Sequence, residues 1–366
     1  MRGFRDPAAA SRLMDAVRAT VQGTLRVIEF CGGHTHAIMR YGLRGALAPQ
    51  VQLLSGPGCP VCVTASADID QAIALSGRPG ITLATFGDMI RVPGTTTSLQ
   101  GARARGADVR VIYSALDALE LARALPQREV VMLGIGFETT APTIAAALRQ
   151  AESEGLANFT VYSMHKLTAP AMRAILDAGE LAVDAVLGPG HVAAITGWQA
   201  WSFLPEEYGV SCAVAGFEPL DILQALLACA EDQARGEPRI TNAYGRGVSA
   251  LGNSTALRLM DEVFMPTDAA WRGLGVIPGS GLAIRPGLAR YDARQRFGLP
   301  GMAEGPLDAE AAVGCRCGEV LRGVVEPPQC PLFGAACTPA HPVGPCMVSA
   351  EGSCAAYYRY RGIMDI

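Results

Sequence analysis

The chain has 366 residues, of which half are hydrophobic and 17% are charged, so it can bury the cores of two or three ordinary domains. Its formal charge is −4, from 30 basic and 34 acidic residues with no long basic run, which argues against a nucleic-acid partner. The first residues lack an apolar signal core, and glycine, proline and polar residues interrupt the longest uncharged run. We therefore expect a cytoplasmic protein without membrane association.

The chain opens with a predicted helical unit, residues 1–25, in which apolar side chains at helical spacing run from Pro7 to Val21. Short apolar runs then alternate with longer helical stretches. The expected strands are 27–30, 51–54, 81–85 and 109–113, and the expected helices are 37–47, 67–75, 99–105 and 116–125. This alternation predicts a parallel sheet covered on both faces, as in Rossmann-like domains. We assign the first α/β lobe to residues 26–128.

A second α/β lobe is predicted over residues 129–237, where the succession of strand, glycine turn and helix start recurs. Segment 27–38 resembles 130–144, segment 53–65 resembles 185–197, and segment 84–90 resembles 214–223. Three matches in the same order indicate an internal duplication. The predicted fold class is therefore α/β, with two similar Rossmann-like lobes facing one cleft. The loops after the strands would meet there, because open parallel sheets bind ligands at the carboxyl ends of their strands.

The C-terminal region, residues 238–366, has little periodicity and holds six of the eleven cysteines. Its part at about 312–356 is rich in cysteine, proline and glycine, so we expect a bound cofactor to hold it together. A [4Fe–4S] cluster is favoured, because the two short knuckles typical of zinc sites are missing and thiolates suit iron. The best candidates are Cys315, Cys330, Cys337 and Cys354, separated by 14, 6 and 16 residues. Structural zinc and free buried thiols remain alternatives, and spacing alone does not select four ligands from the six cysteines.

Residues 56–62, GPGCPVC, place Cys59 and Cys62 in a turn between a predicted strand and a predicted helix. A thiol at a helix N-terminus has a lowered pKa, and the Cys-x-x-Cys spacing permits a disulfide. We interpret the pair as a dithiol/disulfide couple. The alternative is half of a zinc site that Cys31 or His34 would complete.

Residues 31–36, CGGHTH, directly follow the first predicted strand. A cysteine nucleophile with a histidine base is one interpretation, but no nucleophile elbow surrounds Cys31. We favour a metal-binding thiolate at Cys31, with His34 or His36 as a proton shuttle or as support for the ligand. A buried cysteine with hydrogen-bonded histidines is the structural alternative. Gly32 and Gly33 would let a partner's backbone or a ligated iron come close.

Two glutamates occupy matching positions near predicted helix starts, Glu138 in GFETTAP and Glu218 in GFEPLD. A helix-capping carboxylate explains each one structurally, and a proton-accepting group facing the cleft explains each one functionally. His165 and His191 are balanced between structure and function in the same way. The segment TFGDMIRVPG, residues 85–94, is expected to hold either a structural Asp–Arg pair or a site for an anion or partner.

These motifs together resemble the HypD family of [NiFe]-hydrogenase maturation factors. The resemblance runs from about residue 26 to the C-terminus and rests on FCGGHTH, GPGCPVC, TFGDMIRVPG, GFETTAPT, YSMHK, GPGHVAAITG, GFEPLDIL and the terminal CRCGEVLRG to GPCMVSAEGSCAAYYRY. It implies a scaffold on which the Fe(CN)₂CO group of the hydrogenase is assembled, together with a HypC-type chaperone and a HypE-type cyanide donor. It also implies two Rossmann-like lobes plus a cluster domain.

The resemblance implies roles for individual cysteines as well. Cys31 would hold the nascent iron together with the N-terminal cysteine of the chaperone, and Cys59 and Cys62 would form the redox dithiol. The [4Fe–4S] ligands would be Cys315, Cys330, Cys337 and Cys354, which leaves Cys317 and Cys346 unexplained. We hypothesise that electrons pass from the cluster through the dithiol and support cyanide transfer onto the iron. The chain would then be a redox-active maturation factor rather than a conventional turnover enzyme.

Two other functions stay open at this stage. The first is a ferredoxin-linked disulfide reductase, which would need a surface for an electron donor and a disulfide substrate. The second is a binding scaffold stabilised by structural zinc. Metal analysis and a visible absorption spectrum of anaerobically purified protein distinguish the zinc scaffold from the iron–sulfur protein.

Overall fold

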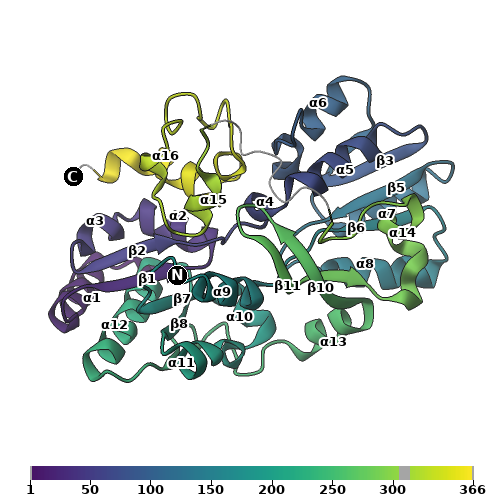
Figure 1. The fold of residues 1–366 in the computed structure, drawn as a ribbon. Coiled ribbons are helices and arrows are strands. Elements are labelled where there is room, and N and C mark those ends of the chain that lie inside the picture. The colour runs from purple at the N-terminus through teal and green to yellow at the C-terminus, as the bar shows by residue number, and fades with distance from the viewer. Residues whose placement is uncertain (1, 305–313, 365–366) are drawn as a thin grey trace.

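The computed structural model describes residues 2–304 and 314–364, and Figure 1 shows two α/β sheets with a Cys-rich segment packed beside the first. Parts of the predicted units fall outside these ranges: residue 1 of the N-terminal unit, and residues 305–313 and 365–366 of the C-terminal region. No helix in the described ranges is long and apolar enough to cross a bilayer.

The first sheet has five parallel strands in the order β2–β1–β7–β8–β9. Both β7 and β8 are buried along their whole length, as continuous apolar strands covered on both faces should be. The strands are β1 (Leu25–Glu29), β2 (Val51–Ser55), β7 (Ala185–Pro189), β8 (Ser211–Ala215) and β9 (Ile240–Asn242). One face packs against α1 (Pro7–Thr20), α2 (Gly32–Arg40), α3 (Leu43–Leu47) and α12 (Pro219–Arg235). The other face packs against α9 (Thr168–Asp177), α10 (Gly190–Thr196) and α11 (Phe203–Tyr208).

The second sheet has four parallel strands in the order β4–β3–β5–β6. These strands are β3 (Ile81–Phe86), β4 (Val109–Ile112), β5 (Glu129–Gly134) and β6 (Phe159–Ser163). One face packs against α5 (Ser66–Ser76), α6 (Leu99–Ala104) and α14 (Ala293–Phe297). The other face packs against α7 (Ala115–Ala124), α8 (Ala141–Glu154) and α13 (Ser254–Val263). The predicted α/β class with two Rossmann-like units is confirmed.

Smaller elements join the two sheets. The antiparallel hairpin of β10 (Phe264–Trp271) and β11 (Gly275–Ile284) packs on the second sheet, and Trp271 forms an isolated bridge with Thr64. Thr64 directly follows α4 (Pro60–Val63), the short helix between the two sheets in Figure 1. The Cys-rich segment contains α15 (Cys317–Leu321) and α16 (Ser353–Met364), with 3₁₀ turns at Pro327–Gln329 and Pro345–Met347. Its α16 packs against α2.

The two sheets are interleaved in the sequence, and this differs from the expected division at residues 128 and 129. The chain forms β1 and β2, builds the second sheet from β3 to β6, and then returns to the first sheet with β7. The expected boundary falls between β4 and β5, which both border β3. The matching segments identify strand–turn–helix units, which every parallel strand of this kind possesses. They therefore do not reveal which sheet a strand joins.

Candidate functional site

Cys31 lies at the carboxyl end of β1 and begins helix α2. Its Sγ accepts a hydrogen bond from the Gly33 N–H at 3.3 Å, so the thiol itself caps the helix. The helix therefore starts at Gly32, five residues before the expected start, and His34 and His36 lie in its first two turns. Only 4% of Cys31 is exposed, and burial raises the pKa of its thiol far above the ordinary range. A thiol held neutral in this way becomes an effective thiolate ligand when a cation compensates its charge.

Two neighbouring residues, Glu29 and Gly58, fix the backbone around Cys31. The buried carboxylate of Glu29 accepts the Cys31 N–H at 2.9 Å and also the Thr35 hydroxyl. Gly58 packs directly on Cys31, because a Cβ there would lie 2.4 Å from the Cys31 N and Cα atoms. This close approach brings the end of β2, and with it Cys59, to the end of β1.

Two other segments of the chain pack closely against Gly32 and Gly33, the glycines after Cys31. A Cβ at Gly32 would lie 2.2 Å from the Glu351 carbonyl oxygen of the Cys-rich segment. A Cβ at Gly33 would lie 3.1 Å from the ring of Phe217, which follows β8. The space that the sequence analysis left for a partner's backbone is therefore taken by Glu351 and Phe217.

His191 is the imidazole nearest to the Cys31 thiol. It lies in the first turn of α10, directly after β7, with Nδ1 at 3.6 Å from the Cys31 Sγ. Burial lowers the pKa of His191 to about 4, so the ring is neutral at pH 7. Sequence reasoning left His191 balanced between structure and function. The missing information was that β1 and β7 are neighbours in one sheet.

The two histidines of the CGGHTH motif, His34 and His36, have other partners. His34 is completely buried, stacks on Phe217 with ring centres 4.9 Å apart, and its Nε2 lies 3.0 Å from the Gly216 carbonyl oxygen. Burial lowers the pKa of His34 to about 4. His36 pairs through Nε2 with the Tyr360 hydroxyl at 2.9 Å, which ties α2 to α16. The structure supplies a local structural partner for each ring, and their proton-transfer roles stay predictions.

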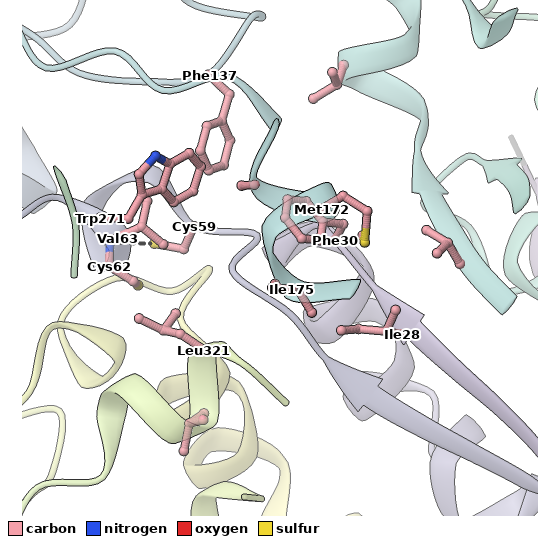
Figure 2. Packing of buried hydrophobic residues seen from close by; sticks show 14 of the residues in the cluster. Ile28, Phe30, Cys59, Cys62, Val63, Phe137, Met172, Ile175, Trp271 and Leu321 are labelled. Carbon is pink, nitrogen blue, oxygen red and sulfur yellow. Dashed lines mark hydrogen bonds between the residues drawn. The ribbon is translucent and has the colours of Figure 1, made fainter. Parts of the chain in front are cut away.

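Cys59 and Cys62 sit at the two ends of a single helical turn. The Cys59 Sγ accepts the Cys62 N–H at 3.3 Å as the cap of α4, and both side chains are buried. Figure 2 shows the pair beside Val63 and near the rings of Phe137 and Trp271, whose centres are 6.0 Å apart. This aromatic cover excludes water from the dithiol.

The environment distinguishes the two thiols of the pair. Burial, with the hydrogen bond and negative charge of Cys62, raises the pKa of Cys59. Burial also opposes the Cys62 thiolate, but hydrogen bonds from the Cys346 and Cys59 thiols and the charge of Arg272 outweigh it, so the pKa of Cys62 is lowered. One thiolate beside one thiol is the arrangement from which thiol–disulfide exchange proceeds.

Cys317 and Cys346, which the sequence analysis left unexplained, form a second close thiol pair. Their Sγ atoms are 2.9 Å apart, and both side chains are buried. The Cys346 thiol also interacts with the thiols of Cys354 and Cys62. The pair thus connects the Cys59/Cys62 dithiol with the C-terminal cysteines. Long loops separate the two cysteines, so no local spacing could have revealed this contact.

The four predicted cluster ligands gather in the Cys-rich segment. The Cys315 thiol lies within electrostatic range of Cys317, Cys330 and Cys354. Cys354 interacts with Cys346 and lies within electrostatic range of Cys317 and Cys337. The Val343 N–H points at the Cys337 Sγ at 3.4 Å, as backbone amides do toward cluster sulfurs. A Cβ at Gly344 would lie 2.8 Å from the Cys315 Sγ, so only glycine leaves this thiol its place. These contacts fit a [4Fe–4S] group held by four thiolates.

A single metal ion is accommodated less readily. Across residues 2–304 and 314–364, no three His, Cys, Asp or Glu side chains converge closely enough to hold one ion. Zinc needs such convergence, because four ligands must lie about 2.0–2.3 Å from one centre. A cubane does not, since each thiolate binds a different iron atom.

The two predicted glutamates both cap helices. The Glu138 Oε1 accepts the Thr168 N–H at 2.8 Å and the Thr168 hydroxyl at 3.0 Å at the start of α9, and burial raises the pKa of Glu138. Glu218 begins α12 and forms an ion pair with Arg5, with 2.7 Å between Oε1 and the Arg5 Nη2. Glu218 therefore lies at the start of the helix that its own segment begins, as the structural explanation expected. Glu138 instead caps α9, whereas Thr140 is the N-cap residue of α8.

Asp88 and Arg91 form no ion pair with each other in the described structure and instead bind the Cys-rich segment. The Asp88 Oδ2 accepts the Ser349 hydroxyl at 2.8 Å, and the Arg91 Nη2 donates to the Val348 carbonyl oxygen at 3.1 Å. The loop after β3 therefore holds the segment that carries Cys346 and Cys354.

The fold and the thiol arrangement define an α/β protein that has a lone cysteine at the carboxyl end of a parallel sheet, a Cys-x-x-Cys pair on a short helix, and a second close cysteine pair within a Cys-rich segment. Residues 8–361 match the family described as "HypD: Hydrogenase formation hypA family". The chain is 46% identical to the hydrogenase maturation factor HypD of Rhodobacter capsulatus, over 98% of this chain and 97% of that protein. It is 42% identical to the HypD of Escherichia coli (strain K12), over 98% of this chain and 97% of that protein. The chain therefore belongs to the HypD family of hydrogenase maturation factors.

Proposed function

We propose that this protein is the scaffold on which the Fe(CN)₂CO group of a [NiFe]-hydrogenase is assembled. Cys31 holds the iron as cargo, together with a cysteine of a HypC-type chaperone, and a HypE-type partner delivers cyanide as a thiocyanate. The position of Cys31 supports this: it lies at the carboxyl edge of a parallel sheet, where α/β proteins bind ligands.

The cyanide step needs electrons as well as a ligand. Cleavage of the partner's S–CN bond to a thiolate and a cyanide ion consumes two electrons, which the cyanide carries onto iron(II) as a bonding pair. Oxidation of Cys59 and Cys62 to a disulfide supplies two electrons and releases two protons. His191, at 3.6 Å from the Cys31 Sγ, is placed to accept the proton that Cys31 loses on binding iron.

The thiol contacts carry the electron-supply part of the proposal. The sulfur atoms of Cys317 and Cys346 are 2.9 Å apart, and Cys346 interacts with both the predicted cluster ligand Cys354 and the dithiol member Cys62. A bound [4Fe–4S] cluster would supply one-electron reduction there, held by Cys315, Cys330, Cys337 and Cys354. Two such transfers restore the dithiol, with the protons taken up from solvent. The chain's own contribution is to hold the sulfur atoms in series and exclude water from them.

Thiol counting after photoreduction tests the relay. The protein is purified anaerobically, oxidised mildly and reduced with photoexcited deazaflavin, and free Cys59 and Cys62 are then counted by alkylation and mass spectrometry. Wild type should gain both thiols. Cys346→Ser should keep the brown chromophore while Cys59 and Cys62 stay joined, and Cys229→Ser, which alters a buried cysteine in α12, should behave as wild type. Recovery of free Cys59 and Cys62 to the wild-type extent in Cys346→Ser would contradict the relay.

A further inference from the structure

A polar pocket of about 470 Å³ opens beside the thiol relay. It lies between the loop that follows Asp88 and the turn that follows Cys337, and its walls include Arg91, Arg272, Thr95, Thr96, Ala340 and Val343. No part of the proposed maturation chemistry uses this pocket.

The pocket is positively charged. Its only charged lining side chains are the two arginines, and no carboxylate lines it. Arg91 donates to the Val348 carbonyl oxygen at 3.1 Å, and Arg272 donates to the carbonyl oxygens of Thr64 at 3.0 Å and Pro93 at 3.3 Å. Within the described residues neither guanidinium forms a direct ion pair, although Arg272 also lies within electrostatic range of the Cys62 thiol and of Asp70. Both guanidinium charges face the pocket and contribute positive potential there. The Thr96 and Thr97 hydroxyls on the wall are further donors for carboxylate oxygens, whereas the Thr95 hydroxyl donates to the Asp70 Oδ2 at 2.5 Å.

The wall of the pocket is also the outer wall of the redox centre. Val343 lines the pocket and directs its N–H to the Cys337 Sγ, and the neighbouring Gly344 packs against the Cys315 Sγ. On the other side, the Arg272 N–H binds the Val63 carbonyl oxygen next to Cys62. Electron transfer slows steeply with distance, so an electron carrier must dock where the protein covering the acceptor is thin. The exposed turn at Ala340 is such a place.

We propose that this pocket is the docking site of an acidic electron-carrier protein, one of whose surface carboxylates pairs with Arg91 and Arg272. The inference rests on the proposed function, because it assumes a cluster at Cys337. A low-potential iron–sulfur carrier is oxidised by one electron at each visit, and two visits reduce one disulfide to two thiols with two protons from solvent. A small anion in the pocket would not touch a thiol, since Cys62 and Cys337 are buried behind the wall. A docked carrier protein does not have to touch a thiol, because it transfers an electron through the wall.

The test uses the complete, cluster-loaded protein and a reduced plant-type [2Fe–2S] ferredoxin as the acidic probe. Stopped-flow absorbance gives the second-order rate constant for cluster reduction at low and high salt. We expect at least a tenfold fall between 25 and 250 mM salt, because screening weakens the attraction. Arg91→Glu should lower the low-salt rate constant at least tenfold and flatten the salt dependence. Ala340→Trp fills the pocket without changing charge and should also slow reduction.

Controls separate docking from folding and from the cluster itself. Arg258→Glu makes the same charge change on exposed α13, away from the pocket, and should behave as wild type. The small methyl viologen radical cation should reduce the cluster in every variant at least as fast as in wild type, because it needs no docking site and a more negative pocket does not repel it. In spectra of ¹⁵N-labelled ferredoxin, wild-type protein should shift acidic-patch signals, and Arg91→Glu should not. This readout does not depend on turnover.

Two results would overturn the inference while leaving the proposed function intact. One is normal ferredoxin reduction in Arg91→Glu and Ala340→Trp. The other is competition by phosphate for the pocket without any effect on ferredoxin reduction, which would show a small-anion site only. Failure of methyl viologen to reduce any cluster in wild type would instead overturn the proposed function, and the docking site with it.

Discussion

Cys31 is positioned mainly through contacts to its own backbone atoms. Gly58 contacts the Cys31 backbone, Glu29 accepts its N–H, and Gly33 donates to its sulfur. Such backbone contacts leave the thiol itself free for a ligand while fixing its direction. Preorganisation of this kind lowers the cost of binding a metal.

Gly58 provides a direct test of this packing. Gly58→Ala would place a Cβ against backbone atoms that cannot move aside, so we expect a loss of about 2 kcal/mol in the free energy of unfolding. Denaturant titration measures it. Gly45→Ala, in α3 with open space around the added methyl, is the matched control and should be neutral or gain up to about 1 kcal/mol. Equal effects at the two glycines would contradict the packing argument.

The imidazole at Cys31 provides a second test at the scale of a residue. His191→Ala removes the neutral ring beside the thiol, and we expect hydrogenase maturation to fall at least about tenfold. Hydrogenase activity in a host that lacks its own copy of this factor is the measurement, with protein level checked by immunoblot. His36→Gln loses a contact with Tyr360 only and should mature hydrogenase at nearly the wild-type rate. If His36→Gln lowered maturation more than His191→Ala, the proton-transfer role would belong to His36 and not to His191.

At the scale of elements, four parallel strands of the first sheet bring the site together at one edge. Cys31 follows β1, Cys59 follows β2, His191 follows β7, and Phe217 follows β8. The rule that parallel sheets bind ligands at their carboxyl ends therefore holds here. The second sheet contributes mainly the loop after β3, which supports the Cys-rich segment.

A buried network joins helix α5 to strand β6 of the second sheet. Lys166, the single lysine of the chain, is completely buried, and its Nζ lies 4.0 Å from the Asp68 Oδ2. Asp68 also binds Arg294 at 2.7 Å and accepts the Tyr162 hydroxyl at 3.1 Å. Burial, only partly offset by the charge of Asp68, lowers the pKa of Lys166 from 10.5 to about 8.

This lowered pKa predicts a specific pH dependence. Between about pH 8 and 10.5 the unfolded lysine binds a proton that the native one has lost, so Lys166 makes stability rise with pH in that window. The stability difference between wild type and Lys166→Met should therefore shift in favour of wild type over this range, by up to about 3 kcal/mol. Urea titrations at several pH values measure it. Protein labelled with ¹³C at lysine Cε gives one lysine side-chain signal, and its titration near pH 10.5 would contradict the assignment.

The sequence predicts the elements of this fold well, but not how they are connected. Apolar runs and cap residues locate strands such as β2 and helices such as α1 within a residue or two, because those signals are local. Which sheet a strand joins depends on contacts between distant segments. For the same reason Cys59 and Cys62 could be recognised as a pair from their spacing, whereas the contacts Cys317–Cys346 and Cys31–His191 could not.

At the scale of the whole molecule, the Cys-rich segment contacts elements that belong to both sheets. Its α16 packs on α2, which covers the first sheet. Asp88 and Arg91, in the loop after β3 of the second sheet, bind Ser349 and Val348. Figure 1 shows this segment above the first sheet, on the side of α2 and α4. Cys62 and Cys346 lie far apart in the sequence, and the fold brings their thiols together.

The central claim is that Cys31 holds the iron of the nascent Fe(CN)₂CO group, and infrared spectroscopy tests it most directly. The protein is co-purified anaerobically with its HypC-type chaperone, and the region of metal-bound cyanide and carbonyl stretches is recorded. Wild type and Cys212→Ser, which alters a buried cysteine within β8, should show these bands, whereas Cys31→Ala should show none while still binding the chaperone. Cyanide and carbonyl bands of wild-type intensity in Cys31→Ala would contradict the claim.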